Sequence, residues 1–215
     1  MDGPDVAAIG IGVPGRTNAR TGEVLSGGFL DLSGCDFRGS MERTFGRPAA
    51  VANDCSMALI AETRVGAARG VESAVMLTIG TGIGGAAMEN GRIVSGKQSA
   101  GQLGHLIVNH TGRQCVCGQR GCVETESSGT ALRRHLDEAG YSPETRFEHI
   151  LPLAQAGDDR ALSVIHSWAA PLRAAIGTLA ASFDPAVLLL GGGMGRAALD
   201  ALTFLPEATG WYKTI

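Results

Sequence analysis

Short apolar runs alternate along this chain with longer stretches of helical periodicity. Runs of strand length cover residues 6–13, 49–52, 73–79 and 187–190. Apolar positions three and four residues apart predict helices over residues 36–45, 54–68, 128–139, 142–156 and 159–183. Because strands and helices alternate, the pattern predicts an α/β fold built around a sheet.

Turn residues add three local predictions. Asn90-Gly91 is the preferred pair for a type I′ turn, so residues 86–89 and 92–94 should form a hairpin. Ser142 followed by Pro143 predicts a helix that begins with serine as its cap. Pro171 lies inside the longest helical stretch and predicts a kink or break, because proline has no amide hydrogen to donate.

Glycine clusters follow two of the predicted strands. Gly80-Thr81-Gly82-Ile83-Gly84-Gly85 comes after residues 73–79, and Gly191–Gly193 comes after residues 187–190. Such clusters let backbone amides approach an anion such as phosphate. Gly80–Gly85 leads into a hairpin rather than a helix, so it is neither a Walker A loop nor a dinucleotide fingerprint. Gly191–Gly193 could equally serve only close packing of a helix on the sheet.

The pair Asn53-Asp54 directly follows another predicted strand. A carboxylate there can act as a base toward a hydroxyl, while the amide holds a neighbouring hydroxyl. The alternative is structural, since aspartate is a favoured cap and a helix is predicted from residue 54. The spacing leaves both interpretations open.

Three cysteines and one histidine form the most specific motif of the chain. Cys115-Val-Cys117-Gly-Gln-Arg-Gly-Cys122 follows His105 by ten residues. Three thiolates and one imidazole are a complete tetrahedral set for a structural zinc ion, with no position left for water or substrate. The alternative is a disulfide or separate thiols, and a Cys-x-Cys pair is too strained to bridge itself easily.

Composition narrows the class of protein. The chain has 215 residues, enough for one or two domains, with 18 Lys+Arg against 21 Asp+Glu. Without a basic stripe, nucleic acid is not an expected partner, and without a long apolar segment or signal pattern, neither is a membrane. Five cysteines, an odd number, suit a reducing compartment, so a cytoplasmic location is expected.

In this order and spacing the motifs resemble the ROK family of bacterial sugar kinases and sugar-responsive repressors. The matching segments are Gly10-Ile-Gly-Val-Pro-Gly15, Asn53-Asp54, Gly80–Gly85, Ala100-Gly-Gln-Leu-Gly-His105, Cys115–Glu124 and Leu190–Gly193. The resemblance implies an actin-like (ribonuclease H-like) two-lobed fold. Residues 1–63 would be a remnant of the N-terminal lobe and residues 64–215 the C-terminal lobe, with the zinc segment at 105–122.

The resemblance also implies an activity: ATP-dependent phosphorylation of the primary hydroxyl of a hexose, either glucose or an N-acetylhexosamine. Asp54 would be the base and His105 would bind zinc through one nitrogen and sugar through the other. Zinc would be structural, and Mg²⁺ would accompany ATP. The other implied sugar-binding residues are Gly15, Asn53, Gln102 and Glu124, and the implied nucleotide-binding residues are Gly80, Thr81, Gly82, Gly84, Gly191, Gly192 and Gly193.

Two departures from the family pattern qualify this expectation. The chain begins after the family's first phosphate loop and stops before the end of the second lobe, so we expect a fragment with little activity of its own and an exposed edge on residues 6–13. Gln102 stands where the family usually has glutamate, and Phe29 where it tends to have asparagine. Both substitutions leave the identity of the sugar open.

The alternative function is a sugar-sensing module that binds a sugar without phosphorylating it, either repressor-like or a pseudokinase. A purely structural zinc module is a third interpretation, but it gives no reason for Asn53-Asp54, the glycine cluster and Glu124 to occur together. The resemblance also suggests a homodimer.

Overall fold

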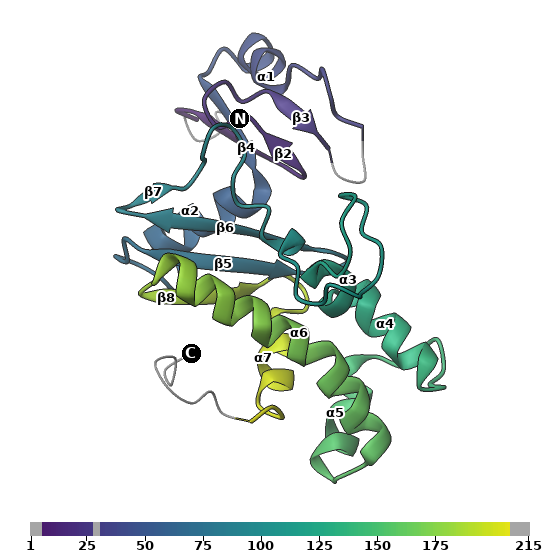
Figure 1. The fold of residues 1–215 in the computed structure, drawn as a ribbon. Coiled ribbons are helices and arrows are strands. Elements are labelled where there is room, and N and C mark those ends of the chain that lie inside the picture. Colours follow the sequence, from purple (N-terminus) through teal and green to yellow (C-terminus); the bar gives the residue numbers. More distant parts are fainter. Residues whose placement is uncertain (1–5, 28–30, 207–215) are drawn as a thin grey trace, which may run out of the picture.

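The computed structural model describes residues 6–27 and 31–206, which form three sheets (Figure 1). The largest has the strand order β7-β6-β5-β8, in which β5, β6 and β7 are antiparallel neighbours and β8 runs parallel to β5. Its strands are β5 (Ala74–Ile79), β6 (Ile83–Glu89), β7 (Arg92–Ile93) and β8 (Val187–Gly191). The two smaller sheets pair β1 (Ile9–Val13) with β4 (Ala49–Asn53) in parallel and β2 (Arg16–Thr17) with β3 (Val24–Ser26) in antiparallel fashion.

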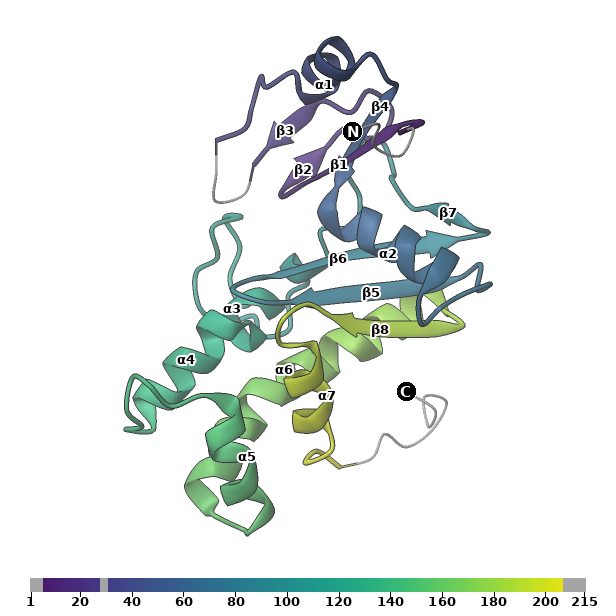
Figure 2. The ribbon, with the colours of Figure 1, turned by 180° about the vertical axis from the view of Figure 1, so that it is seen from behind.

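Helices cover both faces of the large sheet. Helix α2 (Asp54–Val65) lies on one face, and α6 (Asp159–Phe183) and α7 (Gly195–Leu202) lie on the other (Figures 1 and 2). The remaining helices are α1 (Phe37–Phe45), the 3₁₀ turn η1 (Leu103–His105), α3 (Val123–Ser127), α4 (Gly129–Glu138) and α5 (Phe147–Gln155). Among the described helices, none combines the length and apolar character that a bilayer crossing requires, α6 included.

The packing of strand β5 explains why its sequence is almost entirely apolar. Val75 and Leu77 pack into the core beneath α6, where Trp168 is fully buried. Met76 points to the opposite face, where it joins Leu59 of α2. Because successive side chains of a strand alternate between faces, a strand covered on both faces needs apolar residues at nearly every position.

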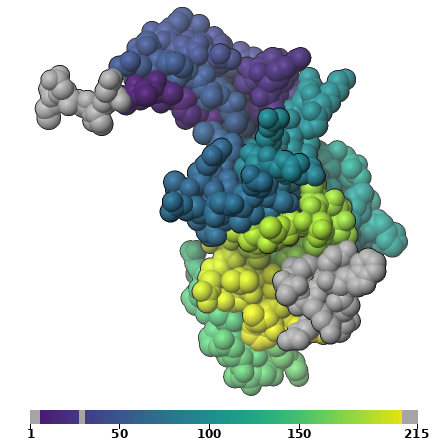
Figure 3. Space-filling view, turned by 90° about the vertical axis from the view of Figure 1, so that its left-hand side faces the viewer, coloured from purple at the N-terminus to yellow at the C-terminus, as the bar shows by residue number. Residues whose placement is uncertain are grey.

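The described residues before α2 gather at one end of the molecule, in the purple and blue region of Figure 3. Helix α2 connects this end to the large sheet, since it begins directly after β4 and buries Leu59 against β5 and β6. Residues 63 and 64, the predicted boundary between the lobes, both lie within α2. The division into lobes therefore stays a prediction.

Several elements agree with the sequence patterns. The runs at 49–52, 73–79 and 187–190 are strands, and the run at 6–13 is a strand from Ile9 onward. Asn90 and Gly91 have φ values of 50° and 70°, and the ladder pairs Glu89 with Arg92 across them. Positive φ at both central residues is the requirement of a type I′ turn, so the predicted hairpin is confirmed.

Three local predictions are wrong. Gly84 and Gly85 belong to β6, so only Gly80–Gly82 form a turn, which we call the glycine turn. Helix α5 begins at Phe147 rather than at Pro143, because the Arg133 guanidinium binds the carbonyls of Pro143 and Thr145 (both 2.9 Å) and holds this segment as a turn.

Helix α6 also differs from the prediction, because it continues through Pro171 without a break. Trp168 and Leu172 are fully buried on either side of the proline. The Ser127 hydroxyl donates to the Trp168 carbonyl (2.6 Å), and the Trp168 indole donates to the Ser128 carbonyl (2.9 Å). Packing and these buried hydrogen bonds offset the one backbone bond that proline cannot make.

Candidate active site and metal centre

One pocket of about 380 Å³ brings together residues from distant parts of the chain. The end of β4, the start of α2, the glycine turn, η1 and α3 all contribute to its wall. All the predicted sugar-binding residues and the predicted base line it, together with four of the predicted nucleotide-binding glycines: Gly15, Asn53, Asp54, Gln102, His105, Glu124, Gly80, Gly82, Gly84 and Gly192. Thr81, Gly191 and Gly193 are not among its lining residues.

Asn53, rather than Asp54, caps helix α2. The Asn53 side-chain oxygen accepts the amide of Ser56 (3.2 Å), and its amide nitrogen donates to the Gly15 carbonyl (2.8 Å). Asp54 is the first helical residue and is exposed. The cap position thus belongs to Asn53, while one oxygen of the Asp54 carboxylate, Oδ1, accepts the Cys55 amide at the start of the helix (2.9 Å).

Glu124 connects helix α3 to the residue that follows the glycine turn. One of its carboxylate oxygens, Oε2, accepts the amide of Ile83, the first residue of β6 (2.9 Å). A Cβ on Gly82 would lie 2.4 Å from this oxygen, so the contact depends on glycine at that position. Because Oε2 is held in this way, Oε1 is the oxygen left for a ligand.

The glycine turn is fastened to helix α4. The amide of Gly129 donates to the Gly80 carbonyl (2.7 Å), and the Thr130 hydroxyl donates to the Thr81 carbonyl (2.8 Å). Gly192 has φ +78°, and a Cβ there would meet the Ile79 carbonyl at 2.5 Å. The two glycine clusters thus approach each other closely, through backbone, at the ends of β5 and β8.

His105, Cys115, Cys117 and Cys122 converge as the spacing predicts. Their ligand atoms all lie within 4.8 Å of one another, with 3.5 Å from Cys115 Sγ to His105 Nδ1 and from Cys117 Sγ to Cys122 Sγ. Tetrahedral zinc would place sulfur about 3.8 Å from sulfur and about 3.5 Å from nitrogen. All five cysteines are free, so the disulfide alternative is not realised.

Local backbone geometry explains how the thiols meet. Gly118 and Gly121 have φ values of +92° and +68°, a region that side chains disfavour, and a Cβ on Gly121 would overlap the Asn109 carbonyl. Burial raises the pKa of the Cys122 thiol, and the neighbouring Cys117 and Cys115 thiols add to this. Thiols placed this close cannot all ionise without a cation between them, so the donor set fits a metal ion.

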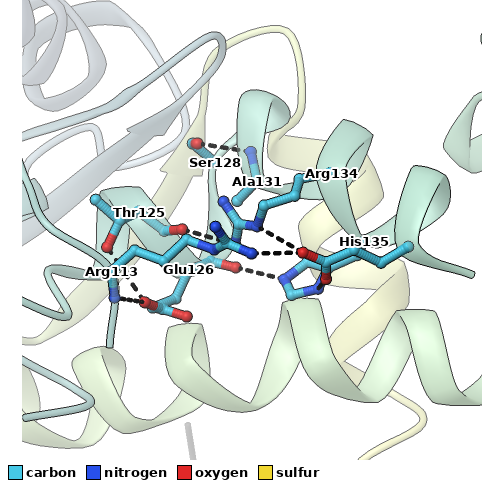
Figure 4. A network of polar contacts seen from close by, with 8 residues as sticks. Arg113, Thr125, Glu126, Ser128, Ala131, Arg134 and His135 are labelled. Carbon is cyan, nitrogen blue, oxygen red and sulfur yellow. Dashed lines mark hydrogen bonds and ion pairs between the residues drawn. The ribbon is translucent and has the colours of Figure 1, made fainter. Parts of the chain in front are cut away.

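A polar network fastens the segment 109–122, here called the metal loop, to α3 and α4 (Figure 4). Glu126 is 9% exposed and its Oε1 accepts the amide of Arg113 (3.2 Å), while the Arg113 side chain pairs with Glu138. Arg134 donates to the Thr125 carbonyl (2.9 Å), and His135 Nε2 bonds the Glu126 carbonyl (3.1 Å). No sequence pattern predicted this network, because its partners are up to 25 residues apart.

The pocket-lining residues that were not predicted as site residues include Cys55, Thr78 and Val116. Their positions in the sequence could have indicated that they lie near the site. Cys55 follows Asp54, Thr78 lies one residue before the end of β5, and Val116 separates two of the predicted metal ligands. Phe29 lies outside the described residues.

Comparison with known proteins places this geometry in a family. A family model described as the ROK family matches residues 2–203. A glucokinase of Thermotoga maritima is 32% identical over 211 residues, covering 91% of this chain and 67% of the relative. An N-acetyl-D-glucosamine kinase of Aliivibrio salmonicida is 30% identical over 202 residues, covering 89% of this chain and 67% of the relative. The chain therefore spans about two thirds of the length of these relatives.

Solved structures agree in fold. A ROK family glucokinase from Streptomyces griseus, in complex with glucose and AMPPNP, matches with a TM-score of 0.77 and 30% identity over 94% of this chain and 71% of its own. A ROK family transcriptional regulator matches with a TM-score of 0.79 and 30% identity over 92% of this chain and 52% of its own. The α/β fold is thus that of ROK sugar kinases, and with a family model matched along nearly its whole length the chain belongs to the ROK family.

Proposed function

We propose that this chain carries the sugar site of an ATP-dependent sugar kinase that phosphorylates the primary hydroxyl of a hexose, either glucose or an N-acetylhexosamine. One observation supports this most directly. The carboxylate of Asp54 is not used as a helix cap and faces the pocket that Glu124, His105 and the glycine turn also line. The glucokinases and the N-acetylglucosamine kinase among the relatives are consistent with both sugars.

In this proposal Asp54 is the general base. Its carboxylate accepts the proton of the primary hydroxyl as the sugar oxygen forms a bond to the γ-phosphorus of ATP, and the bond from phosphorus to the ADP oxygen breaks. Phosphoryl transfer needs positioning and charge neutralisation more than covalent help from the protein. Mg²⁺ entering with ATP would neutralise charge on the phosphate oxygens.

The other sugar-side residues would orient the substrate. Asn53 is already held by Ser56 and the Gly15 carbonyl, so its position is fixed before a sugar binds. Glu124 would offer Oε1, and His105, whose Nδ1 faces Cys115, would offer Nε2. Gln102 would bind a hydroxyl without the added strength of a charged acceptor.

The nucleotide would lie along the glycine turn and the end of β8. Gly80, Gly82 and Gly192 line the same pocket, which supports a phosphate position there. Thr81, Gly191 and Gly193 would contact parts of the nucleotide outside this pocket. Gly84 has a packing role as well, because a Cβ there would lie 2.5 Å from Cys55 Sγ.

We also propose that His105, Cys115, Cys117 and Cys122 hold a structural zinc ion. Four protein ligands leave no open position, so the ion would fix the metal loop rather than activate water. By fixing Nδ1 of His105, it would set the direction in which Nε2 faces the pocket.

The test of the base is Asp54→Asn in a protein of full family length. We expect turnover to fall by roughly three orders of magnitude or more, because the amide cannot accept the proton, while the hexose Kd stays within a few-fold. Calorimetry gives the Kd, and a coupled ADP assay gives turnover. Asp159→Asn, at an exposed position of α6, is the matched control and should behave as wild type. Near-normal turnover of Asp54→Asn would remove Asp54 from this role.

A sugar-sensing module that does not phosphorylate is the second candidate, because a ROK family transcriptional regulator shares this fold over most of the chain. The same two measurements separate the candidates. Hexose binding without turnover in the wild-type protein would favour the sensor, and turnover with ATP would favour the kinase.

A further inference from the structure

The thiol of Cys55 lies between the proposed base and the large sheet. Cys55 is 8% exposed and lines the pocket. Its Sγ is 3.4 Å from Asp54 Oδ1 and 3.0 Å from the hydroxyl oxygen of Thr78. Thr78 belongs to β5, so these contacts connect the first turn of α2 directly to the central strand of the sheet.

The thiol carries its proton at neutral pH. Burial raises the pKa of Cys55 to about 11, and the charge of Asp54 also disfavours the thiolate. A neutral thiol can donate one weak hydrogen bond, and the carboxylate is the stronger of its two acceptors. The direction of both hydrogen bonds follows: the Thr78 hydroxyl donates to Cys55 Sγ, and the Cys55 thiol donates to Asp54 Oδ1.

Asp54 is held through one oxygen only. Oδ1 also accepts the backbone amide of Cys55 (2.9 Å) and the side-chain amide of Asn53 (3.1 Å). Oδ2 has no hydrogen-bond donor within the part of the chain that the structure describes. The carboxylate plane is therefore set from one side while the other oxygen remains free for a substrate hydroxyl.

A second feature of the sheet accommodates this arrangement. A Cβ on Gly84 would lie 2.5 Å from Cys55 Sγ and 2.9 Å from Thr78 Oγ1. Glycine in β6 opposite Thr78 thus leaves the space that the thiol and the hydroxyl occupy.

We propose that Cys55, oriented by Thr78, is a positioning residue that holds Oδ1 of Asp54 and so presents Oδ2 to the hydroxyl of the substrate. The hydrogen-bonding part of this inference concerns the free protein. Its kinetic consequence rests on the proposed kinase function.

The first experiment needs no turnover. The carboxyl ¹³C resonance of Asp54 is recorded at neutral pH in wild type, Cys55→Ala, Cys55→Ser and the exposed-cysteine control Cys35→Ala. Because this resonance responds to the donors on the carboxylate oxygens, Cys55→Ala should move it and Cys55→Ser should restore much of its wild-type position. Cys35→Ala should leave it unchanged. An Asp54 resonance that does not move in Cys55→Ala would overturn the proposal.

The second experiment measures kinetics in the same variants of the full-length kinase. Cys55→Ala should lower kcat by roughly fivefold with the hexose KM within about twofold, because a weak bond to a charged acceptor is lost but no substrate contact. Cys55→Ser, which can still donate to the carboxylate, should recover most of the lost kcat. Thr78→Val should show a smaller loss than Cys55→Ala, and Thr78→Ser none.

The outcomes distinguish the positioning role from the proposed kinase function. Wild-type protein without turnover would refute the kinase and leave the Asp54 resonance readable. A purely structural role for Cys55 predicts a lower melting temperature with no change of the Asp54 resonance and no loss of kcat, and this result would refute the positioning role.

Discussion

The contact between Glu124 and the end of the glycine turn requires a residue without a side chain at position 82. A side chain there would meet Oε2 of Glu124, the far end of a flexible side chain that can move away. The fold would tolerate that movement, but the bond from the Ile83 amide to Glu124 would not survive it. Gly82 is thus needed for the position of Glu124, a proposed sugar ligand, although it lies in the glycine turn.

Gly82→Ala should therefore weaken hexose binding by roughly fivefold while the melting temperature changes by only about 2 °C. Calorimetry and thermal unfolding measure the two quantities. Gly177→Ala is the matched control, because no atom lies within 4 Å of its added Cβ in α6 and alanine favours a helix. A hexose Kd unchanged in Gly82→Ala would mean that Glu124 does not bind the sugar.

The protonation of His135 makes the stability of the folded protein depend on pH. Burial lowers the pKa of His135, with Arg134 also opposing its charge and Glu126 and Glu138 favouring it. As pH falls, the unfolded chain binds this proton first, so the contribution of His135 to stability is present above about pH 6.5 and is lost below it.

Urea unfolding should consequently show a larger loss of stability between pH 7.5 and about pH 5 in wild type than in His135→Gln. The glutamine amide can still donate to the Glu126 carbonyl, so wild type and His135→Gln differ at this position mainly in the charge that histidine can gain. His166→Gln, on the exposed side of α6, should not reduce the pH dependence. Equal pH dependence in wild type and His135→Gln would contradict the assignment.

At the scale of elements, helix α3 serves two purposes within five residues. Glu124 faces the pocket, and Glu126 holds the metal loop through the amide of Arg113. A Cβ on Gly112 would lie 2.6 Å from Glu126 Oε1, so the loop backbone packs directly on this carboxylate. The orientation of the loop is therefore coupled to the helix that carries Glu124.

Glu126→Ala should loosen the metal loop and weaken zinc binding by roughly tenfold, as measured by competition with a chelator. Glu126→Gln keeps an acceptor for the Arg113 amide and should stay within about threefold of wild type. Glu148→Gln, an exposed position of α5, is the control. Equal zinc affinity of the alanine and glutamine variants would show that this bond does not position the loop.

The pattern of apolar positions predicted most elements, because the constraint acts locally. Strand β5 alternates between two buried faces, and the type I′ turn at Asn90-Gly91 follows from two residues that accept positive φ. The start of α5 and the break in α6 were predicted wrongly, because contacts with residues distant in the sequence determine them. Arg133 keeps Pro143 out of α5, and Trp168 with Ser127 carries α6 past Pro171.

For the whole molecule, the proposed zinc ion closes a loop that carries little core of its own. The proposal requires about one zinc per chain by elemental analysis, and its removal with a chelator at neutral pH should lower the melting temperature by at least about 5 °C. Hexose binding should weaken in parallel, because His105 loses its orientation. Added zinc should restore both properties, and calcium should restore neither. Purified protein without a transition metal would exclude the ion.

Oligomeric state is a separate property of the whole molecule. The homodimer and the cytoplasmic location stay predictions, as does the inactivity of the 215-residue chain. Light scattering measures the first, and assaying the chain beside a full-length relative measures the last.

The sequence alone predicted the alternation of strands and helices and the convergence of His105 with three cysteines, because both depend on residue type and short spacing. Only the tertiary structure decided that Asn53 caps α2 and frees Asp54, and that Thr78, 23 residues further on, reaches the thiol beside it. Hydrogen bonds between distant segments depend on where the sheet places its strands, and a linear pattern carries no such distance.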